Sequence, residues 1–157
     1  MTKKWLHHVL EQHHTDAYLW ARQCCDFDDE GAKDVLQMVY LKILEGKAKY
    51  NEKSGVKTWI FSVIRNTAKD HQKSKKALYS LSIVQEIADD YDTHEFVDYQ
   101  AIIRKLPERQ KQVALLVFYH GQTLEEIAEI LELGVGTVRT HYDRGKKALK
   151  ELLINSK

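Results

Sequence analysis

The sequence predicts an all-α protein, and three observations carry that prediction. Among its 157 residues there are only one proline and seven glycines, the two residue types that interrupt helices most strongly. Apolar residues recur every three or four positions along most of the chain, which is typical of amphipathic helices. No segment of useful length alternates apolar and polar residues, as a half-buried strand does. The expected architecture is therefore a set of helices joined by polar turns.

The first half of the chain is expected to hold three helical segments. Apolar residues at helical spacing run from Trp5 to Cys24, with or without a break at Thr15. A polar cluster at residues 26–31 separates this segment from a second helix that ends at Gly46. A basic loop leads to a third helix, whose predicted buried face carries Trp59, Ile60, Val63, Ile64 and Ala68.

The second half of the chain begins a new helical pattern near Tyr99. Pro107 suits the first turn of a helix, and Gly121 suits its end. Thr123 and Glu126, three residues apart, form a capping box at the start of a further helix. This half is therefore predicted to be a separate helical unit.

Charge divides the chain into blocks. Residues 1–77 carry 14 lysines and arginines against 10 acidic residues, whereas residues 78–106 carry 2 against 6. We predict two helical modules, residues 1–77 and 99–157, joined by an acidic linker at 78–98 with room for a short helix from Ile83 to Ala88. Two basic surfaces on either side of an acidic tether indicate a nucleic-acid binder.

The strongest local pattern is a helix-turn-helix at residues 123–149. A short helix, a three-residue turn and a longer basic helix follow one another at the spacing of that motif. Ala128 is small where the two helices are expected to cross, and Val138 is expected to fill the angle between them. The pattern predicts that the second helix presents its outer face to a DNA major groove.

The outer face of this second helix is predicted to bind DNA. Its hydroxyl, imidazole and cationic groups are the types that hydrogen-bond base edges and phosphates. The candidate residues are Thr137, Arg139, Thr140, His141, Arg144 and Lys147. An ordinary helical hairpin with a solvated basic face is the alternative, and the short first helix and tight turn favour DNA binding over it.

Several stretches resemble the sigma-70 family of RNA polymerase sigma factors. The second module resembles region 4 in the stretches Leu106–Val113, Thr123–Leu131, Val135–Arg139 and Arg144–Leu149. The first module resembles regions 2.2 to 2.4 in the stretches Ala32–Lys42 and Lys57–His71. The likeness covers roughly residues 15–77 and 99–153 and leaves no room for regions 1.1 and 3 of the larger sigma factors. It therefore implies the short, extracytoplasmic-function class.

What the resemblance implies can be assigned to residues. In the family, the region 2.2 helix docks on the clamp helices of the largest polymerase subunit, and the matching polar face here carries Asp34, Gln37, Tyr40 and Leu41. Region 2.3 and the loop before it hold the unwound −10 strand, for which cations and aromatic faces are suited. The residues that match are Tyr50, Asn51, Lys53, Lys57, Asn66, Asp70 and Lys73. Region 4 reads the duplex −35 element.

The implied partners are core RNA polymerase, promoter DNA and an anti-sigma factor, with no cofactor and no membrane span. In the free protein the two modules are expected either to fold against each other or to be masked by the anti-sigma factor. The acidic linker is expected to set the distance between the modules, either in the RNA channel of the polymerase or as a plain tether.

Two positions, Met38 and Glu132, depart from the usual pattern of this family, and a third, Trp59, allows two interpretations. Met38 stands where an acidic residue is usual. Glu132 stands where the turn usually has glycine, and a left-handed residue other than glycine costs roughly 1–2 kcal/mol, so a shifted turn is one expectation. Trp59 has the spacing of a core residue, with base stacking as the alternative.

Other classes of protein fit the sequence less well. His7, Glu11 and His14 share a helical face, but no cysteine pair completes a metal site, and we predict none. Enzyme signatures such as a phosphate-binding glycine loop are absent, so no catalytic residue is expected. The adjacent cysteines Cys24 and Cys25 suit reduced packing in a cytoplasmic protein. The serious alternative is a DNA-binding regulator that resembles quorum-type or response-regulator activators and does not join polymerase.

Overall fold

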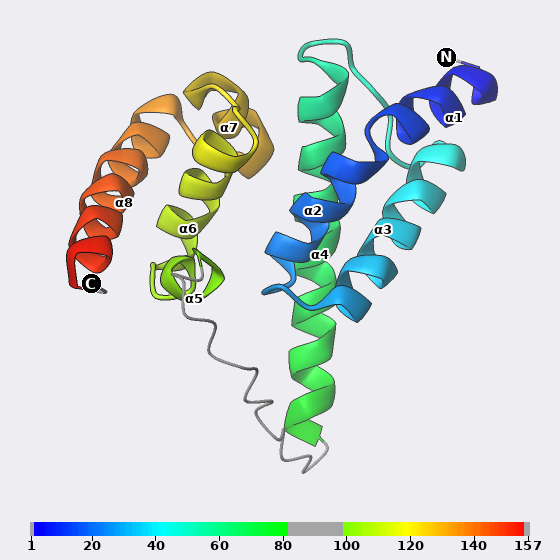
Figure 1. The fold of residues 1–157 in the computed structure, drawn as a ribbon. Helices are drawn as coiled ribbons and strands as arrows, with labels where there is room; N and C mark the ends of the chain where they lie inside the picture. Colours follow the sequence, from blue (N-terminus) through cyan, green and yellow to red (C-terminus); the bar gives the residue numbers. More distant parts are fainter. Residues whose placement is uncertain (1, 82–98, 156–157) are drawn as a thin grey trace.

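The computed structural model describes residues 2–81 and 99–155, and the regular secondary structure in these ranges is helical throughout. The first group comprises α1 (Lys3–Gln12), α2 (His14–Cys24), α3 (Asp29–Leu44) and α4 (Val56–Leu81). The second comprises α5 (Tyr99–Ile103), α6 (Glu108–Ala114), the π-helical turn η1 (Leu115–Tyr119), α7 (Leu124–Leu131) and α8 (Val135–Asn155). Figure 1 shows the two groups side by side. The predicted all-α class is confirmed.

Capping residues set the helix boundaries of the first module. The Thr2 side chain accepts a hydrogen bond from Trp5 N at 3.1 Å, and Asp28 accepts one from Glu30 N at 3.2 Å at the start of α3. The break between α1 and α2 falls at His13 rather than at Thr15. Gly46 adopts a φ of +77° just after α3, the left-handed conformation that suits glycine at this position.

The first module has a core built around two aromatic residues. Trp20 and Phe61 are fully buried, their rings stack with centroids 5.7 Å apart, and Trp20 Nε1 donates to Phe61 O at 3.1 Å. The apolar stripe of α3, from Val35 to Ile43, packs against them. Trp59 is 7% exposed and joins this core, so the core assignment is confirmed over the stacking platform.

The second module follows the helix-turn-helix prediction closely. The capping box forms with Glu126 N to Thr123 Oγ1 at 3.1 Å and Thr123 N to Glu126 Oε1 at 2.9 Å. Ala128 and Val138 are both buried, as a close crossing of α7 and α8 requires. Glu132 takes the left-handed conformation itself, with a φ of 57°, so the expectation of a tighter or shifted turn is wrong. The contacts of the two helices hold the backbone of Glu132 in a strained conformation.

The helix before the helix-turn-helix is less regular than predicted. Instead of one α-helix up to Gly121, the chain passes from α6 into the π-helical turn η1, and His120 N bonds to Leu115 O at 3.2 Å. In a π turn the backbone hydrogen bond joins residues five positions apart instead of four, and such turns are frequent at functional sites. Here it is followed by His120, whose ring lies against the first module.

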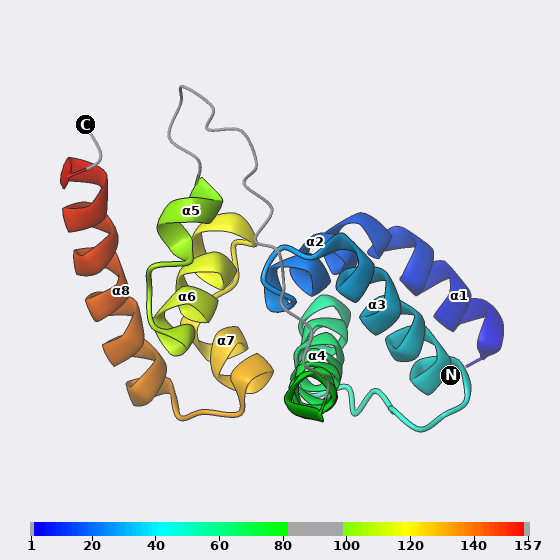
Figure 2. The same ribbon diagram turned by 90° about the horizontal axis from the view of Figure 1, so that it is seen from below.

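The two modules pack against each other, the first of the two arrangements that the sequence left open. Figure 2 shows α7 beside α4, with α8 on the far side of the second module. Thr58 on α4 lies 3.0 Å from Gln122 Oε1 and 3.1 Å from Glu126 Oε2. Nearly all of the predicted linker, including the short helix expected at 83–88, lies outside the described residues.

Candidate nucleic-acid interface

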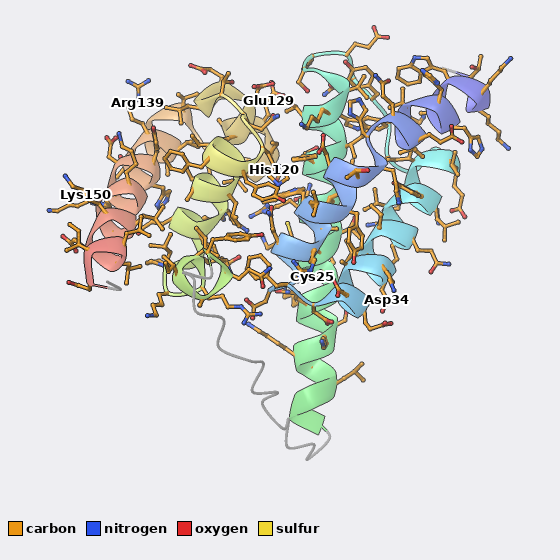
Figure 3. The ribbon with its side chains drawn as sticks, in the orientation of Figure 1. Cys25, Asp34, His120, Glu129, Arg139 and Lys150 are labelled. Carbon is orange, nitrogen blue, oxygen red and sulfur yellow. The ribbon has the colours of Figure 1, made fainter. Side chains whose placement is uncertain are left out.

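The predicted −35 face lies on the outer side of α8. Thr137, Arg139, Thr140, Arg144 and Lys147 are exposed there, whereas His141 is half-buried. Figure 3 shows Arg139 on the side of the molecule away from α4. A helix of this kind places its exposed side chains in a major groove, where arginine and lysine reach guanine and phosphate.

Two neighbouring side chains limit what this face can do. Thr140 Oγ1 donates back to Gly136 O at 3.1 Å, so its hydroxyl proton is occupied while its lone pairs remain free to accept. Lys146 Nζ lies 4.6 Å from the centre of the Tyr142 ring, a cation–π contact that holds it beside the face. Among the candidates on α8, Arg139, Arg144 and Lys147 therefore have the most exposed donor groups.

The candidate −10 residues before α4 form a loop that is held by the first module. The Tyr50 ring lies 5.2 Å from Trp59 and 6.2 Å from Trp5, and its hydroxyl donates to Ser54 O. Asn51 accepts from Lys53 N at 3.1 Å, which closes a tight turn. The structure thus brings Tyr50, Asn51 and Lys53 together, with the asparagine and the lysine exposed.

The candidate −10 residues on α4 spread along one helix. Lys57 Nζ pairs with Asp16 Oδ2 at 3.2 Å, near the start of α4. Asn66 Nδ2 donates to Glu132 Oε1 of the second module at 3.4 Å. Asp70 and Lys73 are exposed further along. Two of these four side chains are therefore engaged inside the protein.

The predicted polymerase-binding face lies on α3, opposite its buried stripe. Asp34, Gln37 and Leu41 are exposed, and Leu41 is 49% exposed although it is apolar. Tyr40 is half-buried; its hydroxyl lies 2.7 Å from His14 Nδ1, and burial raises its pKa to about 12. Figure 3 places Asp34 far from the second module, so this face is open while the modules touch.

The contact between the modules centres on His120. Its Nε2 lies 2.6 Å from Gln23 Oε1, and its ring stands edge-on to Phe61 at 4.9 Å and to Trp20 at 5.7 Å. Burial, followed by the charge of Lys57, lowers the pKa of His120 to about 4. The imidazole is therefore neutral at ordinary pH, and a proton on it would destabilise the contact.

A second contact joins the loop before α3 to the turn that follows α5. Arg104 donates to Asp26 Oδ1 at 3.1 Å and to Asp26 O at 2.7 Å, and its guanidinium lies 5.3 Å from the Phe27 ring. Asp26 and Phe27 both have positive φ angles, 55° and 64°. Residues other than glycine rarely adopt this conformation, so the surrounding contacts hold the loop in a strained shape.

Sequence reasoning missed these residues of the module contact. Little in the sequence points to their role in the contact. His120 is a polar residue that follows an apolar segment, and Gln23 is an amide residue within a helix. Nothing in local spacing shows that the two lie side by side from positions 97 residues apart. Contacts of this kind depend on the docking of complete modules.

The structure also bears on the other sequence-based alternatives. In the described ranges no group of three or more His, Cys, Asp or Glu residues is placed to hold a metal ion. Cys24 and Cys25 are both free thiols, and burial raises the pKa of each. None of the described helices combines the length and the apolar run needed to cross a bilayer.

Comparison with known protein families matches both modules. The chain matches the family model "Sigma-70 region 2" over residues 9–77 and the family model "Sigma-70, region 4" over residues 96–149. It is 27% identical over 131 residues to RNA polymerase sigma factor SigZ of Bacillus subtilis, covering 80% of this chain and 74% of that protein. It is 26% identical to ECF RNA polymerase sigma factor SigX of the same organism, covering 91% and 80%.

Solved structures share the fold. The sigma factor RpoE in complex with the anti-sigma factor NepR from Bartonella quintana superimposes with a TM-score of 0.79 at 20% identity, covering 97% of this chain and 98% of that one. CnrH in complex with the cytosolic domain of CnrY gives 0.71 at 16% identity, covering 99% and 92%. Sigma factors are transcription regulators and not catalytic enzymes. Together, the two matched regions and the shared architecture show that the chain belongs to the sigma-70 family, as a sigma factor of the extracytoplasmic-function class.

Proposed function

We propose that this sigma factor directs initiation by a clamp with two DNA-binding sites. α8 reads the duplex −35 element through the face from Thr137 to Lys147. The loop at 50–53, together with Lys57, Asn66, Asp70 and Lys73 on α4, holds the melted −10 strand. The exposed face of α3 binds the clamp helices of core RNA polymerase. The observation that carries the proposal is the exposed basic face of α8 in a helix-turn-helix whose first helix is closed by a capping box.

The contact between the modules has to open for this mechanism to work. Elements named −10 and −35 lie about 25 base pairs apart, which is on the order of 80 Å of duplex at 3.4 Å per base pair. Modules that touch through His120 and Gln23 cannot span that distance. We therefore propose that the described arrangement is a closed, resting state and that polymerase binding to α3 precedes opening.

The closed state is suited to reversible opening. Gln23 Nε2 is buried at the contact and has no hydrogen-bond acceptor within the described part of the protein, and leaving a buried donor unpaired costs about 1–3 kcal/mol. The polar part of the contact consists of one neutral imidazole and a few hydrogen bonds.

An anti-sigma factor is the proposed regulatory partner. The related RpoE was solved in complex with the anti-sigma factor NepR, and the shared fold makes a similar partner reasonable for this chain. Such a partner would bind the modules and keep them away from polymerase. Co-purification of the chain from its source, with and without core polymerase, tests this.

The proposed function is tested by transcription in vitro. Core RNA polymerase from the source organism is supplied with sheared genomic DNA, with and without this protein, and transcript ends are mapped. New starts that share paired upstream elements are the expected result. Failure to gain initiation and failure to bind core enzyme would sink the sigma mechanism and leave the plain DNA-binding regulator.

A further inference from the structure

A stripe of positive charge runs along one face of α4. Arg65, Lys69, Lys73 and Lys76 are spaced by four, four and three residues, so they follow each other along the same side of the helix. Lys69, Lys73 and Lys76 are exposed, whereas Arg65 is only 6% exposed. This stripe faces the second module.

The second module adds the opposite wall of a cavity. Glu108, Arg109 and Gln112 at the start of α6 lie across from the stripe, and the cavity between them has a volume of about 520 Å³. Cys24, Ala68 and Gln72 complete the lining. Five cationic side chains and one carboxylate therefore line a space that exists only while the modules are packed together.

Arg65 is the most enclosed of these cations. Its Nη1 donates to Asn66 Oδ1 at 3.2 Å, and no carboxylate in the described ranges lies within ion-pair distance of it. Burial, followed by the charge of Arg109, lowers its pKa, while Glu132 and Glu108 at longer range act in the opposite direction. Two guanidinium groups that line one cavity and repel each other are a binding arrangement for an anion.

We infer that this cavity binds a compact polyphosphate group, which bridges α4 and α6 and holds the two modules closed. Arginine binds phosphate oxygens in pairs of parallel hydrogen bonds, and the lysines along the stripe add charge. A volume of about 520 Å³ accommodates a small ligand but not a duplex, whose major groove alone is about 12 Å wide. The observations therefore favour a small polyanion over duplex DNA.

The inference extends the proposed function without needing it for the binding step. Lys73 belongs both to the cavity and to the proposed −10 surface, so a bound polyphosphate would compete with promoter DNA. The ligand would act as an inhibitor that favours the closed state. Binding itself is measured on the protein alone, so its failure is distinguishable from failure of the sigma mechanism.

The first experiment titrates the full chain with inorganic tripolyphosphate by calorimetry at about 0.15 M salt, where weak surface attraction is screened. Saturable binding and a rise of the melting temperature with ligand concentration are expected. A nucleoside triphosphate in a second arm shows whether the source is a free polyphosphate or a phosphorylated nucleoside. If only a single-stranded oligonucleotide binds, the cavity is part of the DNA surface and the inference is overturned.

Matched variants test whether binding depends on this cavity or only on the overall positive charge of the protein. Arg109→Gln and Lys69→Gln remove one cation from each wall, and each is expected to weaken tripolyphosphate binding about tenfold. Lys150→Gln removes an exposed cation on α8, away from α4 in Figure 3, and is expected to leave binding unchanged. Equal affinity in all four proteins would overturn the inference.

A second readout tests closure. With fluorophores on α3 and α8, the loss of energy transfer on acidification is expected to move to lower pH when tripolyphosphate is bound, and Arg109→Gln is expected to need about tenfold more ligand for the same shift. Binding without any change in energy transfer or in melting temperature would overturn the bridging role. Arg65 is left intact in these variants because its burial makes a folding defect the simpler outcome.

Discussion

The two proposed DNA-binding surfaces of this sigma factor differ in how free their side chains are. On α8 most of the −35 candidates lie on the outer face of the helix-turn-helix, and Arg139 and Arg144 are exposed. On the first module, Lys57 pairs with Asp16 and Asn66 bonds to Glu132 of the other module. One surface is available in the closed state, and the other is partly occupied by the protein itself.

If the proposed surfaces bind DNA, this difference predicts an order of events at a promoter. Duplex DNA can meet α8 while the modules still touch, whereas a melted strand has to displace intramolecular contacts on α4. Packing of the two modules is therefore expected to inhibit capture of the −10 strand more than binding of the −35 duplex. The predictions below test that division, from the largest expected effect to the smallest.

Acid is expected to open the modules. The pKa of His120 falls from its ordinary 6.5 to about 4 in the closed state, so the neutral ring stabilises closure above pH 6.5. The neutral ring contributes up to about 3 kcal/mol to the free energy of closure. This contribution is lost as the pH falls from 6.5 through 4. Energy transfer between labelled modules, followed from pH 7 to pH 4, measures it.

The control for the acid effect is His120→Gln. This variant cannot gain a proton, so its closure should depend much less on pH over the same range. Asp16 and Lys57 also act on His120, and they remain in the variant. An unchanged pH profile in His120→Gln would assign the opening to those other groups.

Removal of an exposed arginine on α8 is expected to weaken −35 binding alone. Arg144→Ala should cost about 1–3 kcal/mol in affinity for a −35 duplex, with a change in unfolding free energy below about 0.5 kcal/mol because the side chain is exposed. Fluorescence anisotropy and urea unfolding measure the two quantities. Lys150→Ala is the matched control, and an equal loss there would mean that α8 binds by general charge.

Relief of strain at the turn is expected to stabilise the second module. Glu132 has a φ of 57°, so Glu132→Gly should raise the unfolding free energy by about 1 kcal/mol. Glu132→Gln keeps the strained backbone and removes only the charge, which separates the two effects. If Glu132→Gln stabilises as much as Glu132→Gly, charge repulsion and not the backbone is the cause.

The smallest expected effect concerns the hydrogen bond between the modules. Asn66 and Glu132 meet at 3.4 Å on an exposed part of the contact, so a double-mutant cycle of Asn66→Ala with Glu132→Gln should give about 0.5 kcal/mol of coupling for closure. The energy-transfer assay supplies the four values. Zero coupling would show that Asn66 is already free for a melted strand.

Local features of the second module were predictable because their physics is local. The Thr123–Glu126 capping box and the crossing at Ala128 and Val138 depend on residues a few positions apart, and all four behave as predicted. The π turn was not predictable, because nothing in the apolar spacing of Leu115–Tyr119 distinguishes it from an ordinary helical turn. The role of each predicted DNA-binding and polymerase-binding residue remains a prediction.

The sequence by itself determined the helical class, the helix-turn-helix and the family resemblance, because helix periodicity, caps and motifs depend on residues that are close together in the chain. Only the tertiary structure decided that the modules close on each other, through His120 with Gln23 and Thr58 with Gln122, pairs that lie 97 and 64 residues apart. Such contacts arise from the shapes and charges of whole folded surfaces. The basic cavity between α4 and α6 has the same origin, since neither module forms it alone.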